Sequence, residues 1–151
     1  MSRKYIHYGS DYFEPSEFDQ IENYNGIMGK PFGGLWASPV DSPNMSWKDF
    51  CKSNNFELSK LKHSFTFEIV DSANILLINS DKDVHFLLED SELFSTRSLG
   101  HISWHNLDFE KLIEYEYDGI EVYMSSPDIY WTFYGWDVDS LLVFNPDILI
   151  L

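Results

Sequence analysis

Residues 64–78 read SFTFEIVDSANILLI and contain two strand patterns of different kinds. Phe65, Phe67 and Ile69 alternate with polar residues, which is the pattern of a strand with one face in the core and one in water. After a turn rich in Asp, Ser and Asn, residues 75–78 are apolar without a break. A continuous apolar run of this length predicts a short strand that is covered on both faces.

Helix and strand patterns alternate irregularly on either side of this stretch. Ser46 and Ser80 are each followed three residues later by an aspartate, an arrangement that caps a helix N-terminus, and apolar side chains follow at helical spacing. A third helix is predicted around 109–113 and a shorter one within 15–21. Further strands are predicted at 5–8, 33–38, 120–124 and 141–144. Because the repeated βαβ period of a doubly wound fold is absent, the pattern indicates an α+β fold.

The composition is that of one folded domain. The chain has 151 residues, with 12 Phe, 9 Tyr and 5 Trp, and this aromatic content argues against intrinsic disorder despite the high charge. Cys51 is the only cysteine, so we expect a disulfide-free protein of a reducing, cytoplasmic compartment. We find neither a signal-peptide pattern nor an apolar run long enough to cross a membrane, and therefore expect a soluble single domain over 1–151.

The charge is strongly acidic and unevenly distributed. The net charge is −15, and no Lys or Arg follows Lys111. A surface of this kind repels nucleic acid and anionic membranes, so we expect no direct binding of either. It can instead attract a basic surface of a protein partner. The alternative interpretation is that the acidic residues only keep an aromatic-rich protein in solution.

Common catalytic and metal-binding motifs are missing. Gly33-Gly34 lacks the Lys-Ser/Thr of a phosphate-binding loop, and no zinc-ligand pattern occurs, so no metal site is expected. Cys51 lies at helical spacing from aromatic residues, and we interpret it as a small core residue rather than a nucleophile. Three other places remain as candidate sites.

The first two candidate places lie in the predicted strands near the N-terminus. His7 stands with Tyr8 near the end of the first strand, where a histidine is either structural or a ligand-binding residue. Residues 30–39 read KPFGGLWASP, so that two glycines precede a tryptophan and a serine. Gly34 and its neighbour permit either a close approach of the backbone to a ligand or a bulge in an edge strand.

The third candidate place is a pair of carboxylates before the last buried strand. Asp137 and Asp139 are two residues apart, which puts both side chains on one face of an extended segment. A carboxylate held there can be partly desolvated and point into a cleft between sheets. Exposed acidic residues at the start of a strand are equally common.

Together, the three places resemble the ADP-ribosyltransferase family in its histidine–aromatic–acid form. This resemblance implies an α+β fold of two small packed β-sheets with short flanking helices, and NAD as the substrate. A first-strand histidine holds the nicotinamide ribose in that family, and His7 matches it. Trp36 and Ser38 match the second-strand segment that lines the nicotinamide pocket. The acid that stabilises the oxocarbenium-like transition state matches Asp139, or else Asp137. The NAD-binding residues implied in this way are His7, Tyr8, Gly34, Trp36 and Ser38.

The chain departs from the family pattern in three respects, the first of which is a second strand without the Ser-Thr-Ser motif of the arginine-type branch. The matching acid is aspartate, one methylene shorter than the usual glutamate, so its reach to the ribose differs. NAD is anionic, and the net charge opposes its binding unless Arg3, Lys4 or Lys30 compensates locally. The segments around Gly-Gly-Leu-Trp and Gly-Trp-Asp also resemble those of small proteins of bacteria and their phages. That likeness covers nearly the whole chain and brings no known activity with it.

Two functional hypotheses follow. The first is an NAD-dependent ADP-ribosyltransferase or NAD-cleaving enzyme, of bacterial or phage origin, that acts on a macromolecular target in a bacterial or infected host cell. The second is a non-catalytic acidic binding protein, such as a phage-encoded inhibitor or nucleic-acid mimic, that docks on a basic protein surface. An enzyme requires a concave pocket that joins His7 to Asp139, whereas a mimic requires carboxylates spread over a convex face.

Overall fold

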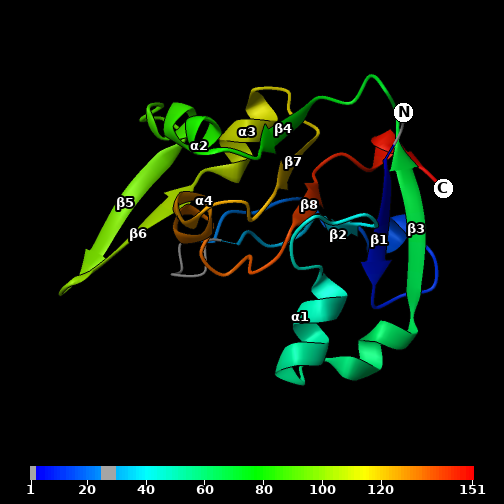
Figure 1. Cartoon of the computed structure of the whole chain (residues 1–151). Helices are drawn as coiled ribbons and strands as arrows, with labels where there is room; N and C mark the ends of the chain where they lie inside the picture. Colours follow the sequence, from blue (N-terminus) through cyan, green and yellow to red (C-terminus); the bar gives the residue numbers. More distant parts are fainter. Residues whose placement is uncertain (1–2, 25–29) are drawn as a thin grey trace.

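The structure, a computed structural model, describes residues 3–24 and 30–151, without the side chains of 96, 97, 99 and 102–105. Its centre is a seven-stranded mixed sheet in the order β4-β7-β8-β2-β1-β3-β9 (Figure 1). The strands are β1 (Lys4–Tyr8), β2 (Leu35–Pro39), β3 (Ser64–Ile69), β4 (Ile75–Ile78), β7 (Gly119–Val122), β8 (Ser140–Val143) and β9 (Leu149–Ile150). Strands β4 and β7 run parallel, and the other neighbouring pairs of this sheet are antiparallel.

The remaining elements surround this sheet. The hairpin of β5 (Phe94–Leu99) and β6 (Ile102–Leu107) forms a second, two-stranded sheet that extends away from the rest (Figure 1). The helices are α1 (Trp47–Asn54), α2 (Asp81–Leu88), α3 (Phe109–Glu114) and α4 (Pro127–Thr132), with 3-10 turns η1 (Pro15–Glu17), η2 (Leu58–Lys62) and η3 (Pro146–Ile148). Helices α2 to α4 gather near β4 and β7, whereas α1 lies below β2. Within the described residues, no helix has both the length and the apolar character to cross a bilayer.

Strand β8 holds the fold together because both of its faces are buried. Leu142 packs into a core that it shares with α2, α3 and α4, while Leu141 and Val143 pack into a second core with Tyr5 and Phe67. Successive side chains of a strand point to opposite faces, so one short strand serves both cores. Each buried Leu or Val contributes about 1.5–3 kcal/mol of transfer free energy. The prediction of a buried strand at 141–144 is confirmed, with bounds one residue earlier.

The junction of β1 and β2 decides the shape of the sheet. The two strands pair at only two positions, Tyr5 with Pro39 and Ile6 with Ser38, whereas β1 pairs with β3 at five. Because this junction is so short, the sheet can curl there. The predicted α+β class is confirmed. The expected pair of small packed sheets is correct only in part, since one continuous sheet contains seven strands and the second sheet is a hairpin.

The helix starts were well marked by their caps. Ser46 and Ser80 each accept a hydrogen bond from the backbone N–H of the residue three positions on, at 3.2 Å in both cases. The acceptor satisfies one of the N–H groups that have no partner within the first turn. The predictions that α1 and α2 begin at these serines are therefore confirmed.

Two local predictions are wrong. The helix expected within 15–21 is only the turn η1, because Phe18 and Ile21 pack into different cores and the chain must extend between them. Strand β4 is not covered on both faces. It is an edge strand that pairs with β7 alone, and Leu77 is 46% exposed.

Candidate functional site

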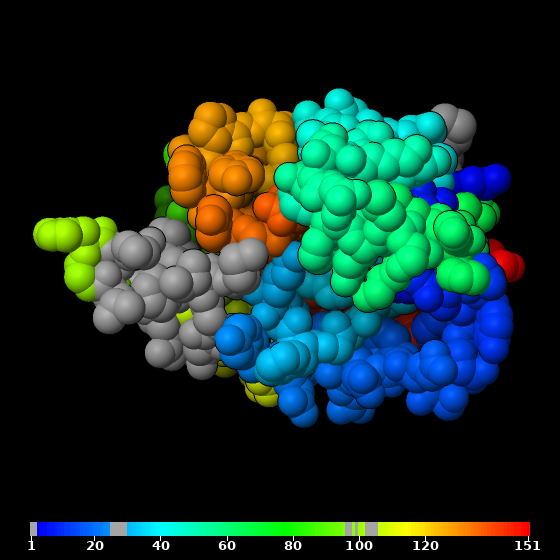
Figure 2. Space-filling view, turned by 90° about the horizontal axis from the view of Figure 1, so that it is seen from below, coloured from blue at the N-terminus to red at the C-terminus, as the bar shows by residue number. Residues whose placement is uncertain are grey.

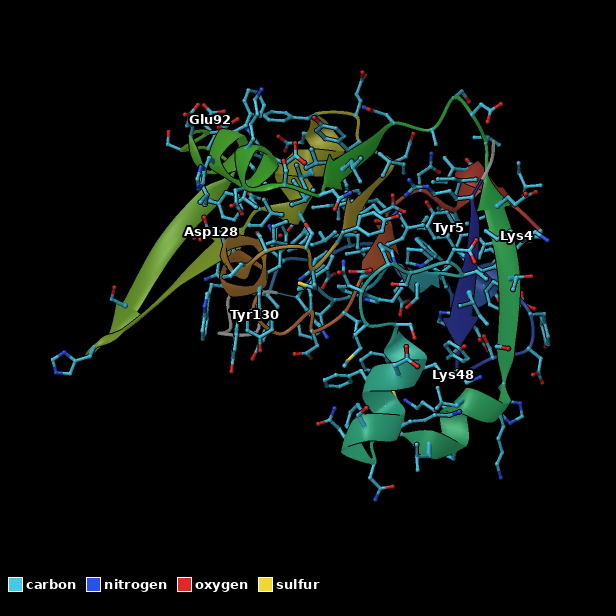
Figure 3. The ribbon with its side chains drawn as sticks, viewed as in Figure 1. Lys4, Tyr5, Lys48, Glu92, Asp128 and Tyr130 are labelled. Atoms are coloured by element: carbon cyan, nitrogen blue, oxygen red, sulfur yellow. The ribbon has the colours of Figure 1, made fainter. Side chains whose placement is uncertain are left out.

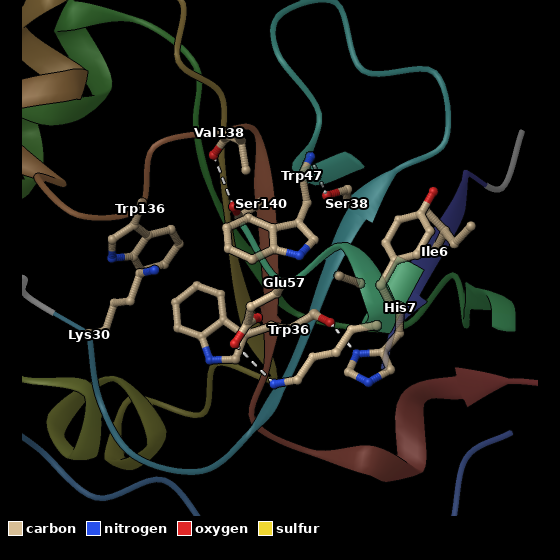
Figure 4. Close-up of a pocket in the computed structure, with 13 residues that line it drawn as sticks. Ile6, His7, Lys30, Trp36, Ser38, Trp47, Glu57, Trp136, Val138 and Ser140 are labelled. Atoms are coloured by element: carbon tan, nitrogen blue, oxygen red, sulfur yellow. Dashed lines mark hydrogen bonds and ion pairs between the residues drawn. The ribbon is translucent and has the colours of Figure 1, made fainter. Parts of the chain in front are cut away.

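A pocket of about 330 Å³ opens between β1, β2, α1 and the segment that leads into β8 (Figure 4). Its aromatic lining residues are Tyr8, Trp36, Trp47 and Trp136. Its uncharged polar and charged lining residues include His7, Ser38, Ser140, Lys30, Glu57 and Lys60. Sites for small ligands are typically concave and largely apolar, with a few polar groups that fix orientation. The pocket has this character.

Four of the residues expected to bind NAD come together in this pocket. They are His7, Tyr8, Trp36 and Ser38, from two strands that are almost 30 residues apart in sequence. Trp36 and Ser38 share a face of β2 because strand side chains alternate with a period of two. Ser140, at the start of neighbouring β8, adds a hydroxyl to the same pocket. The second-strand pattern therefore identified real pocket residues.

The His7 imidazole takes the place of a missing backbone pair. Strands β1 and β2 separate after Ile6 and Ser38, and Nδ1 of His7 lies 2.6 Å from the carbonyl oxygen of Trp36. A carbonyl can only accept, so Nδ1 carries the proton. Burial lowers the pKa of His7 below its ordinary value of 6.5, which keeps the ring neutral near pH 7. Nε2 is therefore an acceptor, and no partner for it lies among the described residues.

The lowered pKa of His7 predicts a pH dependence of stability. Between the folded pKa and 6.5 the unfolded chain binds more protons than the folded chain, so the free energy of unfolding falls as the pH is lowered through this window. In His7→Asn the amide nitrogen can still donate to Trp36, but nothing titrates. We expect urea denaturation at pH 7.5 and pH 5 to show a larger loss for wild type than for His7→Asn. Equal losses would mean that His7 is not held neutral.

A cation already lies against the aromatic walls. Nζ of Lys30 is 5.5 Å from the ring centroid of Trp36 and 6.0 Å from that of Trp47. Burial lowers the pKa of Lys30, and nearby carboxylates oppose this effect. Of the cations expected to offset the acidic charge, Lys30 lines the pocket, whereas Arg3 and Lys4 do not. Arg3 instead donates to the Glu121 carboxylate at 3.4 Å.

Glu57 supplies a carboxylate that sequence reasoning missed. Among the described lining residues it is the only one with an acidic side chain, and it pairs with Lys60 at 3.1 Å. Figure 4 shows the Glu57 carboxylate pointing into the pocket. Its backbone has φ 47° and ψ 35°, a left-handed conformation that costs a non-glycine residue about 1–2 kcal/mol. Such strain tends to occur at functional positions. The sequence near Glu57 contains no motif that marks it.

Asp139 does not face this pocket, and the expectation that it would is wrong. Its side chain is fully buried and accepts hydrogen bonds from the Ser42 hydroxyl at 2.6 Å, both Asn44 nitrogens at 3.0 and 3.1 Å, and the Met124 backbone N–H at 2.7 Å. The residues on either side of it, Val138 and Ser140, line the pocket. Because successive side chains of an extended chain point in opposite directions, Asp139 points away from the pocket. The carboxylate joins the loop after β2 to the loop after β7.

Asp137 and Gly34 also lie outside the pocket lining. Asp137 has φ 66°, so residues 137–139 are not one extended segment and the two carboxylates do not share a face. Gly34 has φ 74°, and a Cβ there would lie 2.6 Å from the Leu142 side chain and 2.7 Å from that of Ile21. The close approach expected at Gly34 is therefore to the protein core and not to a ligand.

Comparisons with protein-family models, curated proteins and solved structures found no match for this chain. The geometry of the pocket therefore carries the functional argument.

Proposed function

We propose that the pocket binds NAD and that the chain is an ADP-ribosyltransferase or an NAD-cleaving enzyme. The observation that carries this proposal is the convergence of His7, Tyr8, Trp36 and Ser38 on one pocket. Their match to the family pattern depends on the sequence alone, so their shared position in space supports the proposal independently.

The charges of the pocket suit the nicotinamide ring and the phosphate of the nicotinamide mononucleotide half of NAD. The nicotinamide ring of NAD is a cation, and tryptophan faces attract cations. Trp36 and Trp47 already have the Lys30 ammonium group against them. Displacement of Lys30 by the ring would free its charge for a phosphate. Lys60 is a second cation of the lining. Local positive charge of this kind offsets the net charge of −15, which salt screens over longer distances.

His7 has the hydrogen-bonding capacity to orient the ribose. With Nδ1 donating to Trp36, the unprotonated Nε2 can accept a hydrogen bond from a ribose hydroxyl. Because the pKa of His7 is lowered, this acceptor is present throughout the neutral range. Ser38 and Ser140 offer further hydroxyls, although the Ser140 hydroxyl already donates to the Val138 carbonyl oxygen at 2.9 Å.

Glu57 takes the role that the family pattern assigned to Asp139 or Asp137. Cleavage breaks the bond between the ribose C1′ and the nicotinamide nitrogen, and the electron pair leaves with the nitrogen. Nicotinamide becomes neutral and positive charge develops on the ribose. A carboxylate fixed nearby stabilises that charge. Water or a nucleophile of the target then bonds to C1′ and releases its proton to the carboxylate or to solvent.

The proposal is tested by calorimetric titration of NAD into wild type and His7→Asn. We expect wild type to bind, and His7→Asn to bind at least about tenfold more weakly because one hydrogen bond to the ribose is lost. His85→Asn is the matched control, since His85 is an exposed histidine on α2 outside the pocket lining, and its binding should equal that of wild type. Absence of wild-type binding at millimolar NAD would overturn the proposal.

A further inference from the structure

Helix α4 presents three large aromatic rings to solvent. Tyr130, Trp131 and Tyr134 contact one another, with ring centroids 5.4 Å, 5.9 Å and 6.2 Å apart, and we call these three residues the aromatic face. Trp131 is 68% exposed, and the two tyrosines are also exposed. The planes of the Trp131 and Tyr134 rings are nearly parallel, at 10° to each other.

The outward position of these rings is built into the helix. Ile129 and Phe133, four residues apart, are buried in the core and fix the inner side of α4 and of the turn that follows it. Tyr130 and Trp131, which lie between them, are therefore turned away from the core, and Tyr134, which follows Phe133 directly, is exposed as well. Soluble proteins rarely leave contiguous apolar rings in water, and where they do the surface usually binds a partner. We therefore interpret the aromatic face as a binding surface.

The charges around the aromatic face are acidic. Asp128 lies on α4 with Tyr130 and is exposed (Figure 3). Its Oδ2 is 3.2 Å from Nε2 of His85 on α2, a helix that starts with Asp81 and Asp83 and includes Lys82. Downstream of Lys111 the chain has no Lys or Arg at all. Charge complementarity therefore favours a cationic partner.

Arginine fits this surface better than lysine does. A guanidinium group is planar, so it can stack on the ring of Trp131 or Tyr134 and pair with a carboxylate such as Asp128 at its edge. Trp136, two residues after Tyr134, lines the pocket. Figure 2 shows the segment around 127–137, in orange, next to α1 and the residues that follow it on the face seen from below.

We propose that the aromatic face binds an arginine-containing basic segment of a protein partner. The guanidinium groups stack on Trp131 and Tyr134, and the acidic residues of α4 and α2 attract the segment and set its orientation. This inference does not depend on NAD, because none of the three rings lines the pocket. If the pocket also acts as proposed above, the bound segment is positioned beside it as a target.

The test is the affinity of a fluorescein-labelled Arg-Gly-Arg-Gly-Arg peptide for four forms of the full chain: wild type, Trp131→Ala, Trp131→Leu and Phe86→Ala. Loss of the Trp131 ring is expected to weaken binding by about tenfold in both Trp131 variants. Phe86→Ala is the matched control, because it removes a 77% exposed ring from α2 outside the aromatic face, and it should bind like wild type. Circular dichroism checks that each variant is folded.

Three outcomes would overturn the inference. Equal affinity of wild type and both Trp131 variants would mean that the peptide binds by general charge attraction alone. Concentration-dependent dimerisation that Trp131→Ala abolishes would assign the aromatic face to a second copy of the chain. Binding of a single-stranded RNA oligonucleotide that Trp131→Ala abolishes would assign it to base stacking.

Discussion

Replacing Glu57 by glutamine is expected to lower NAD turnover by about 100-fold or more while NAD affinity stays within about threefold of wild type. Glutamine keeps the size and one oxygen of the side chain but removes its negative charge. Positive charge on the ribose develops only during cleavage. Loss of the Glu57 carboxylate charge therefore affects the rate much more than it affects ground-state binding. The ion pair with Lys60 is exposed, and its loss costs little stability. Release of nicotinamide, followed by chromatography, measures the rate.

Asp137→Asn is the matched control for this experiment. It removes a carboxylate that the family pattern offers as the alternative to Asp139 and that does not line the pocket, and asparagine tolerates the left-handed backbone of that position. Its turnover should stay within about threefold of wild type, because Asp137 acts on the pocket only through its charge near Lys30. The reverse result, with Asp137→Asn inactive and Glu57→Gln active, would return the catalytic role to one of the two carboxylates proposed from the sequence. Because NAD binding is measured separately, an error in the role assigned to Glu57 is distinguishable from an error in the assignment of the NAD site.

The pocket residues that were predicted from the sequence are those whose side-chain direction follows from strand geometry. Trp36 and Ser38 are two residues apart on a real strand, so their shared face was predictable. The same reasoning failed for Asp137 and Asp139, because one residue with positive φ breaks the alternation on which it depends. Glu57 could not be found from periodicity, since it lies between α1 and η2, where only the folded chain brings it to the pocket.

A similar division holds for the fold. Serine caps and apolar spacing located α1 and α2, and β4 has the bounds that its apolar run predicted. The β5–β6 hairpin was missed because residues 94–107 are rich in polar side chains and show no clear alternation. Helix α4 was also missed, although Ser126 caps it and Pro127 opens it. Its apolar spacing is hidden because the exposed rings of Tyr130 and Trp131 directly follow the buried Ile129.

Removal of the Asp139 carboxylate should have the largest effect on stability. We expect Asp139→Ala to lower the free energy of unfolding by about 3–4 kcal/mol, because the part-buried donors of Asn44 and Met124 lose a shared charged acceptor, and hydrogen bonds to charged groups contribute about 1.5–3 kcal/mol each. The alanine also leaves a small cavity beside Ser42. Urea denaturation that gives the midpoint and the m-value for both proteins measures the change.

Asp137→Asn again serves as the control, because among the described residues this nearby carboxylate does not accept a comparable set of hydrogen bonds. We expect its free energy of unfolding to stay within about 0.5 kcal/mol of wild type. A loss of less than about 1 kcal/mol in Asp139→Ala would show that the two loops do not depend on this carboxylate.

The same variant distinguishes a structural role of Asp139 from a catalytic one. At a temperature where it remains folded, Asp139→Ala should still bind and cleave NAD, because its carboxylate faces the loops and not the pocket. Full inactivity of that folded variant would instead place Asp139 in the chemistry.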